Sequence, residues 1–279
     1  MMEPVRLALL NMEIEAGEPG ANAEALLDYA RRAAAEGAEY VFAPELTLTG
    51  YAVRRFRELA EPPDGPLCSR LVNAAAELGV VLGFGAVLAV GDDIFNAYVV
   101  AGRHGAALFG KFHRWWLGDS DFTPWPRPSV LPLRRFTLGV MVCFDGRFPE
   151  TARTLALMGA DLIVWPSCWP APPKSDPRFL DIIGRARSFE NQCYVALANR
   201  CGSSAAENTE YAGASALFGP TGEVVERAAG EPGIVMADMD LDRLRSVRRS
   251  FDIYSERRPE LYRPLCELKR PPWAEEAGR

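Results

Sequence analysis

Short apolar runs alternate with helix-like segments along almost the whole chain. Continuous apolar runs of this length are typical of buried strands, whereas apolar residues spaced three and four apart indicate helices. This alternation predicts an α/β fold with mixed sheets. The strands are predicted at 5–10, 40–43, 80–90, 94–101, 136–142, 161–165 and 193–199, and the helices at 21–37, 66–78, 149–158 and 178–191.

The alternation runs without a composition break that would mark a domain boundary. Gly91, Asp92 and Asp93 form a turn signal between two apolar runs, which predicts a hairpin inside the sheet. One domain is therefore expected over 5–262. The proline-rich segment 263–279 shows little periodicity and is expected to be an extended tail.

Charge and composition exclude several classes of protein. A net charge of −6 gives no basic footprint for nucleic acid or an anionic membrane. No apolar run approaches the roughly 20 residues that span a bilayer, and the first residues do not resemble a signal peptide. A cytoplasmic protein with neither a nucleic-acid nor a membrane partner is expected.

Cysteine and histidine usage narrows the chemistry further. Six cysteines stand at irregular spacings, which indicates reduced thiols and neither a disulfide framework nor a zinc site. Only His104 and His113 are available for a histidine-based dyad or metal centre, so no metal is expected.

Three reactive residues each follow a predicted buried strand. They are Glu45, Lys111 and Cys143, and Lys111 is one of only three lysines among 31 basic residues. Ligands gather beyond the carboxyl ends of strands in α/β proteins, and a strand-to-helix turn after Val142 favours a thiolate at Cys143. Taken singly, each has an ordinary alternative: a capping glutamate, a surface lysine and a core cysteine.

Taken together, these segments resemble the carbon–nitrogen hydrolase family, also called the nitrilase superfamily, in its amidase and carbamoylase branch. The similarity lies in PELTLTGY at 44–51, GKFH at 110–113 and CFDGRFPE at 143–150. Further similar segments are RARSFENQ at 185–192, GPTG at 219–222 and RRPELY at 257–262. The resemblance covers roughly residues 5–262.

The resemblance implies a fold and a mechanism. The fold is a four-layer α-β-β-α sandwich whose protomers pair into a homodimer or a larger homo-oligomer. Glu45 is the general base, Cys143 attacks a small amide and forms a thioester, and Lys111 with the main-chain N–H of Phe144 stabilises the oxyanion. No cofactor is required. Asp145 and Arg147 are interpreted as residues that orient this turn, with direct substrate contact as the alternative.

Other positions are assigned more loosely. The resemblance places Tyr51, Trp116, Ser167, Cys168 and Trp169 as candidate pocket residues. The family usually carries a second glutamate shortly after the lysine, but this chain has none between Lys111 and Glu150. Asp119 and Asp121 are the candidate substitutes.

Three readings of the function remain. The first is a hydrolase of small linear amides or N-carbamoyl compounds. The second is a nitrile hydrolase, which is disfavoured because nitrilases typically follow the cysteine with Trp-Glu and this chain has Phe-Asp. The third is a binding or assembly module that keeps the fold without activity. Arg114 and Arg127 are candidates to receive a substrate carboxylate, or are solvated. The sequence does not identify the substrate.

Overall fold

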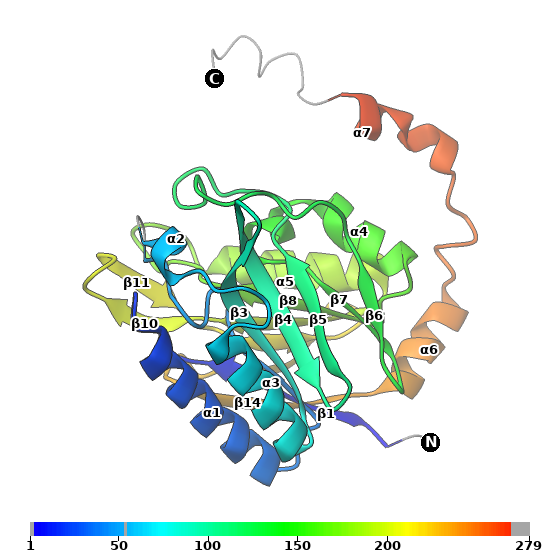
Figure 1. Cartoon of the computed structure of the whole chain (residues 1–279). Coiled ribbons are helices and arrows are strands. Elements are labelled where there is room, and N and C mark those ends of the chain that lie inside the picture. The colour runs from blue at the N-terminus through cyan, green and yellow to red at the C-terminus, as the bar shows by residue number, and fades with distance from the viewer. Residues whose placement is uncertain (1–2, 53–54, 269–279) are drawn as a thin grey trace.

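Two six-stranded sheets pack face to face, and helices cover both outer faces (Figure 1). This computed structural model describes residues 3–52 and 55–268. The arrangement is the predicted α-β-β-α sandwich, and its sheets are mixed as expected.

The first sheet carries two of the three predicted reactive residues at its strand ends. Its central strands β1, β2 and β3 are parallel, and antiparallel neighbours flank them. The predicted hairpin is confirmed as the pair β3 and β4. In spatial order the strands are β14 (Gly233–Met239), β1 (Val5–Asn11), β2 (Tyr40–Phe42), β3 (Val81–Val90), β4 (Asp93–Gly102) and β5 (Gly105–Gly110).

The second sheet carries the cysteine. Its central strands β7, β8 and β9 are parallel, again with antiparallel neighbours. In spatial order it contains β13 (Val224–Arg227), β12 (Ala216–Phe218), β9 (Tyr194–Asn199), β8 (Leu162–Ser167), β7 (Thr137–Val140) and β6 (Val130–Pro132). A separate hairpin, which the sequence did not predict, joins β10 (Cys201–Ser204) and β11 (Thr209–Ala212).

The helices divide between the two outer faces. Side chains of α1 and α3 share a core cluster with the first sheet, and side chains of α4 and α5 share one with the second. The bounds are α1 (Pro19–Ala35), α2 (Phe56–Leu59), α3 (Pro66–Leu78), α4 (Pro149–Leu157), α5 (Arg178–Asn191), α6 (Leu241–Ser250) and α7 (Arg263–Glu267), with 3₁₀ turns η1 (Cys143–Arg147) and η2 (Pro259–Tyr262).

A third apolar cluster fills the space between the two sheets. It contains Leu7, Leu9 and Phe42 from the first sheet together with Val140 and Val164 from the second, all essentially inaccessible to solvent. Because side chains alternate faces along a strand, each strand supplies this inner layer and an outer layer under the helices. Both faces of each sheet are therefore buried, which explains the continuous apolar runs.

The helix predicted at 149–158 is confirmed as α4, and a 3₁₀ turn at Cys143–Arg147 leads into it. One local expectation was wrong. Within the expected extended tail, residues 263–267 form the short helix α7, where Pro264 fits the first turn and Arg263 pairs with Glu267 one turn later. The remainder, 269–279, lies outside the described residues. Within 3–52 and 55–268, no helix is long and apolar enough to cross a membrane.

Candidate active site

The edge where the two sheets meet brings the predicted residues together. Glu45 follows β2 and Lys111 follows β5 in the first sheet, whereas Cys143 follows β7 in the second. Cys168 follows β8, next to the cysteine strand. Residues that follow strands of both sheets thus lie together at this edge.

Four hydrogen-bond donors hold the Glu45 carboxylate in place. The Glu45 side chain is completely buried. Its Oε1 accepts hydrogen bonds from Lys111 Nζ at 2.7 Å, Asn96 Nδ2 at 2.8 Å and Tyr51 Oη at 3.0 Å, and its Oε2 accepts one from the Cys168 main-chain N–H at 3.1 Å. Buried carboxylates require such partners. The carboxylate is therefore fixed in orientation.

The main chain beside Glu45 lies unusually close to β3. A Cβ at Gly85 would stand 2.1 Å from the Leu46 nitrogen, so only glycine fits there. Leu46 itself has a φ of 45°, in the left-handed region that non-glycine residues rarely adopt. The turn that carries Glu45 therefore packs in direct contact with β3 of the first sheet.

Lys111 is buried between two carboxylates. Its Nζ lies 2.7 Å from Glu45 Oε1, 2.7 Å from Asp119 Oδ2 and 3.2 Å from Tyr51 Oη. Burial alone would lower the pKa of Lys111, but the charge of Glu45, followed by the interactions with Cys143 and Asp119, outweighs burial and raises the pKa. The lysine is therefore a fixed ammonium in the resting site.

Asp119 is fully buried, whereas the alternative Asp121 is exposed and lies outside the cluster. Asp119 Oδ2 also accepts the Trp115 main-chain N–H at 2.7 Å. Burial raises the pKa of Asp119, and the Lys111 ammonium opposes that shift. Of the two candidate substitutes for the missing glutamate, the structure places only Asp119 beside the lysine.

Cys143 stands on a strained turn. Its φ is 44°, in the left-handed region, and Trp165 Nε1 donates to its carbonyl oxygen at 2.8 Å. Burial, followed by the charge of Glu45, raises the pKa of Cys143 well above that of an ordinary thiol. Desolvation and the neighbouring carboxylate thus oppose the thiolate that the turn alone favours, and they outweigh the stabilisation by Lys111.

Asp145 ties the cysteine turn to the lysine segment. It is buried, and its carboxylate accepts main-chain N–H groups from Val142 at 2.9 Å and from His113 at 2.9 Å. His113 Nδ1 lies 2.8 Å from the same carboxylate, and its ring stacks on Phe148. Asp145 thus has the orienting position that the sequence predicted for it, and it bridges the two sheets.

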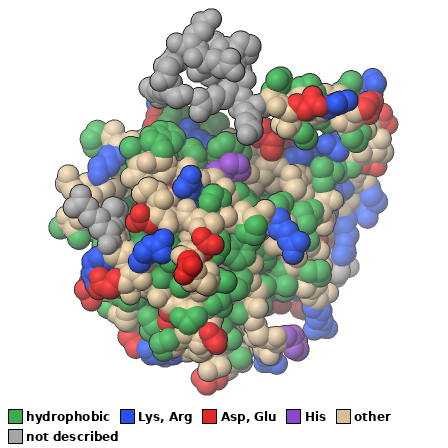
Figure 2. Space-filling model, turned by 45° about the horizontal axis from the view of Figure 1, so that its top comes forward, with side chains coloured by type: hydrophobic (Ala, Val, Ile, Leu, Met, Phe, Trp, Pro, Cys, Tyr) green, Lys and Arg blue, Asp and Glu red, His purple; other side chains and the backbone are tan. Residues whose placement is uncertain are grey.

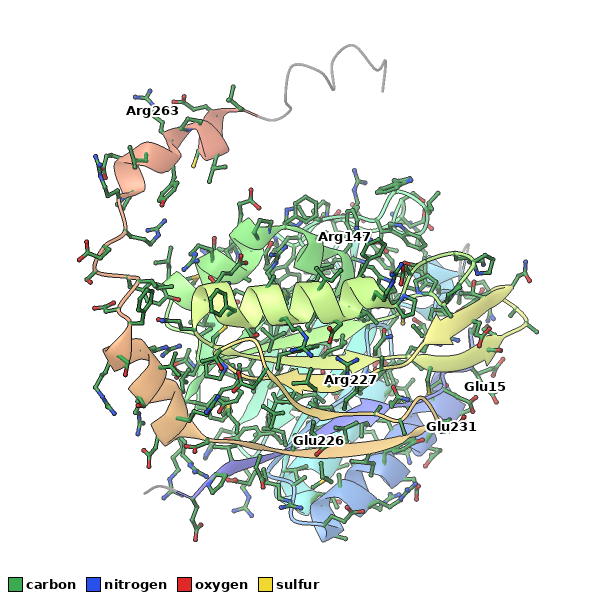
Figure 3. The ribbon with its side chains drawn as sticks, turned by 180° about the vertical axis from the view of Figure 1, so that it is seen from behind. Glu15, Arg147, Glu226, Arg227, Glu231 and Arg263 are labelled. Atoms are coloured by element: carbon green, nitrogen blue, oxygen red, sulfur yellow. The ribbon has the colours of Figure 1, made fainter. Side chains whose placement is uncertain are left out.

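Arg147 does not have the orienting position that was predicted for it. Its side chain is exposed, and its guanidinium lies over the rings of Trp169 and Phe179, at 4.8 and 4.9 Å. The turn is held instead by Arg187 of α5, whose Nε and Nη2 donate to the carbonyls of Gly146 and Arg147. Figure 3 shows Arg147 above α5. The sequence contains a family-like segment with Arg187, but nothing in that segment indicates which turn the arginine contacts.

A cavity with two arms opens beside the thiol. The thiol arm, about 440 Å³, and the hairpin arm, about 820 Å³, share six lining residues: Tyr51, Trp115, Leu117, Cys168, Pro170 and Lys174. Only the thiol arm is lined by Trp116, Cys143, Phe144, Arg147, Trp169 and Ser175. Only the hairpin arm is lined by Ala16, Ala52, Arg55, Gly118, Ala206, Glu207, Thr209 and Tyr211.

Four of the five predicted pocket residues line this cavity, and Ser167 does not. Tyr51 and Cys168 stand at the junction of the arms, Trp169 is almost completely buried in the thiol-arm wall, and Trp116 is 71% exposed at its edge. Ser167 is completely buried at the end of β8. Strand alternation explains this, since neighbouring positions point to opposite sides.

Two further residues of the site, Asn96 and Lys174, were not predicted from the sequence. Asn96 is a polar residue inside the apolar run of β4, and its burial beside Glu45 explains why it is there. Lys174 lines both arms and is another of the scarce lysines, but it follows no strand end. Arg114 and Arg127, the candidate carboxylate receivers, line neither arm. Among 3–52 and 55–268, no group of three or more His, Cys, Asp or Glu side chains is arranged to hold a metal ion.

Comparison with known proteins agrees with this geometry. A family model described as carbon–nitrogen hydrolase matches residues 6–249. The chain belongs to the carbon–nitrogen hydrolase family. Among its relatives, a nitrilase of Pyrococcus abyssi is 32% identical over 92% of this chain and 99% of the relative. The human deaminated glutathione amidase is 31% identical over 86% of this chain and 79% of the relative.

A solved structure of this carbon–nitrogen hydrolase family gives a direct structural comparison. It is a Glu-to-Gln variant of the amidase from Nesterenkonia sp. AN1, with a TM-score of 0.80 and 26% identity over 94% of this chain and 96% of that chain. That structure shows covalent addition of the acetamide moiety of fluoroacetamide at the active-site cysteine. The chain is therefore a carbon–nitrogen hydrolase of the amidase-like branch.

Proposed function

We propose that this carbon–nitrogen hydrolase cleaves a small linear amide through a thioester on Cys143. One observation carries the proposal: Cys143, the buried and fully hydrogen-bonded carboxylate of Glu45, and Lys111 at 2.7 Å from that carboxylate converge where the two sheets meet, and burial together with the charge of Glu45 raises the thiol pKa. A thiol near a carboxylate base is the arrangement that general-base catalysis needs.

The residues act in two steps. In the first, Glu45 takes the thiol proton as Cys143 attacks the amide carbonyl, and Lys111 with the Phe144 N–H stabilises the oxyanion. The C–N bond then breaks and the nitrogen leaves with the proton from Glu45. In the second, Glu45 deprotonates a water molecule that attacks the thioester, which releases the acid and restores the thiol.

Within this mechanism, Asp119 is the second acid. Its carboxylate lies as close to Lys111 as that of Glu45 does. When Glu45 becomes protonated in the first step, Asp119 still neutralises the ammonium and keeps it oriented towards the oxyanion. An aspartate in a loop that returns over the lysine thus replaces the glutamate that the family usually carries.

The substrate is an amide whose acyl portion ends in a carboxylate. Arg147 and Lys174 both line the thiol arm, and neither has a carboxylate partner among the described residues. The Arg147 guanidinium lies over two aromatic rings, an arrangement that holds it in place for a planar anion. Two cations in the wall of the thiol arm favour an acidic acyl chain over a neutral one.

A substrate panel tests the proposal. Ammonia release is measured across succinamic acid, neutral amides of the same length, N-carbamoyl amino acids and the matching nitriles. We expect succinamic acid to be hydrolysed fastest and Cys143→Ala to abolish turnover with an unchanged melting temperature. Peptide mapping after fluoroacetamide treatment is expected to locate the adduct on Cys143. Absence of any adduct and of any turnover would instead support a catalytically idle module, and preferential release from nitriles would support a nitrile hydrolase.

We also propose that the chain works as a homodimer or larger homo-oligomer. The outer surface of α4 and α5 exposes Leu157, Ile182 and Phe189, and the segment after α6 exposes Phe251 and Leu265. Figure 1 shows this segment leaving the body of the molecule. Such exposed apolar side chains are typical of interfaces. Sedimentation at micromolar concentration tests this, and a stable monomer would contradict it.

A further inference from the structure

The cavity extends well beyond the reacting thiol. The hairpin arm does not reach Cys143 and lies towards the turn of the β10–β11 hairpin, which contributes Ala206 and Glu207 to its wall. In Figure 3 this hairpin stands apart from the position of Arg147, which lines the other arm. A substrate that occupied only the thiol arm would leave the larger volume unused.

We propose that the hairpin arm binds the amine portion of an N-substituted amide, while the acyl portion occupies the thiol arm. This inference rests on the proposed amidase function and deepens it. It assigns to this chain a secondary amide as substrate and an uncharged primary amine as its leaving group.

The position of Glu45 determines which arm holds the acyl portion of the substrate and which holds the amine portion. The leaving nitrogen has to receive its proton from Glu45, which itself lines neither arm. Two residues hydrogen-bond directly to Glu45 and also line the cavity at the junction of its arms: Tyr51 and Cys168. The nitrogen therefore leaves at the junction. With the acyl chain bonded to Cys143 in the thiol arm, a substituent on nitrogen continues into the hairpin arm.

The chemistry balances without an additional reactant. Cys143 Sγ forms a bond to the carbonyl carbon, the C–N bond breaks, and the nitrogen takes the proton that the thiol gave to Glu45. A free primary amine leaves through the hairpin arm. Water then hydrolyses the same thioester that a primary amide would give, so the second step does not depend on the amine.

The hairpin arm fits an uncharged amine portion because the charged residues found only in that arm, Arg55 and Glu207, are already paired, and Lys174 lies at the junction with the thiol arm. Glu207 forms an ion pair with buried Arg200 at 2.7 Å and accepts the Tyr51 main-chain N–H at 2.7 Å. Arg55 pairs with Glu58 at 3.0 Å. Paired charges attract a further ion only weakly, whereas Ala16, Ala52 and Ala206 give the wall of the hairpin arm an apolar surface.

Two substrates with the same acyl group test the inference: succinamic acid and its N-butyl derivative. Both form the same succinyl thioester and release succinate, so a difference in kcat/KM reports the amine portion alone. We expect the two kcat/KM values to agree within about tenfold, and KM to fall along an N-methyl to N-butyl series as the arm fills. Hydrolysis of succinamic acid alone would overturn the inference and leave the proposed function standing. Hydrolysis of neither would contradict the proposed function itself.

A variant that fills the arm provides the second measurement. Ala206→Trp places a large ring in the hairpin arm, and Ala205→Trp, one residue away and outside the arm, is the matched control. We expect Ala206→Trp to lower the ratio of the N-butyl to the unsubstituted kcat/KM by at least about tenfold, because overpacking excludes the substituent. Ala16→Phe, from another part of the wall, is expected to act in the same way. An equal loss for both substrates would place the acyl chain in this arm and overturn the assignment.

Discussion

Asp119→Asn tests the second acid directly, because it removes the charge and keeps the shape. At 2.7 Å and an effective dielectric constant of about 20, the attraction between Asp119 and Lys111 is about 6 kcal/mol before desolvation. Glu45 contributes an equally close partner, so Lys111 stays charged in the variant. The net loss is therefore that of one charge-assisted hydrogen bond, about 1.5–3 kcal/mol of unfolding free energy. That corresponds to a fall in melting temperature of about 2–4 °C per kcal/mol.

The effect on the rate is expected to exceed the effect on stability. With one carboxylate partner left, the ammonium loses its fixed orientation whenever Glu45 carries the proton, and misplacing such a group costs about 10²-fold in kcat. Ammonia release from succinamic acid gives kcat and KM, and differential scanning fluorimetry gives the melting temperature. Asp121→Asn is the control, since that side chain is exposed and its loss should leave both quantities unchanged. A normal kcat in Asp119→Asn, together with the lower melting temperature, would refute the catalytic reasoning and leave Asp119 a structural residue.

Three further variants have distinct expected results. Lys111→Arg is expected to lower kcat by about 10²–10³-fold, nearly as much as Lys111→Ala, because a planar guanidinium does not fit where a compact ammonium is enclosed. If the variant keeps more than about a tenth of the activity, the ammonium does not stabilise the oxyanion. Glu45→Gln is expected to abolish turnover yet speed alkylation of Cys143 by fluoroacetamide at neutral pH. Burial and the Glu45 charge both raise the thiol pKa, and removing the charge lowers it, so the alkylation profile should move to lower pH; a shift to higher pH would contradict this. Arg187→Met is expected to lower the free energy of unfolding by about 1–3 kcal/mol and to lower kcat, because two carbonyls of the cysteine turn lose their donor. Arg178→Met, on the exposed part of α5, is the control. Equal effects of the two substitutions would show that Arg187 has no special role.

The sequence predicted the fold well, because nearly every central strand is buried on both faces and appears as an apolar run. It also indicated Glu45, Lys111 and Cys143, since each follows such a strand. Contacts made by side chains far apart in the sequence were not predictable in this way. Arg187 holds the cysteine turn in place of the predicted Arg147, because composition does not reveal which arginine points inward.

The protonation state of Cys143 was also outside the reach of the sequence. The turn alone favours a thiolate, but burial and the nearby Glu45 carboxylate reverse that preference. Both effects depend on the docking of two sheets. The hairpin arm was likewise unpredictable, because its wall combines the turn of β10 and β11 with residues before α1 and α2. On the face in Figure 2, acidic and basic side chains are interspersed.

The division of the site between two sheets has a consequence for folding. Glu45 and Lys111 belong to one sheet and Cys143 to the other, and Asp145 joins them only when the inner apolar layer has formed. Each sheet can gain its secondary structure before that layer is complete, but neither can then catalyse. We therefore expect recovery of activity to lag behind recovery of the far-ultraviolet circular dichroism signal on refolding. On heating, inactivation should precede the loss of helix and strand, which makes turnover a reporter of sheet docking.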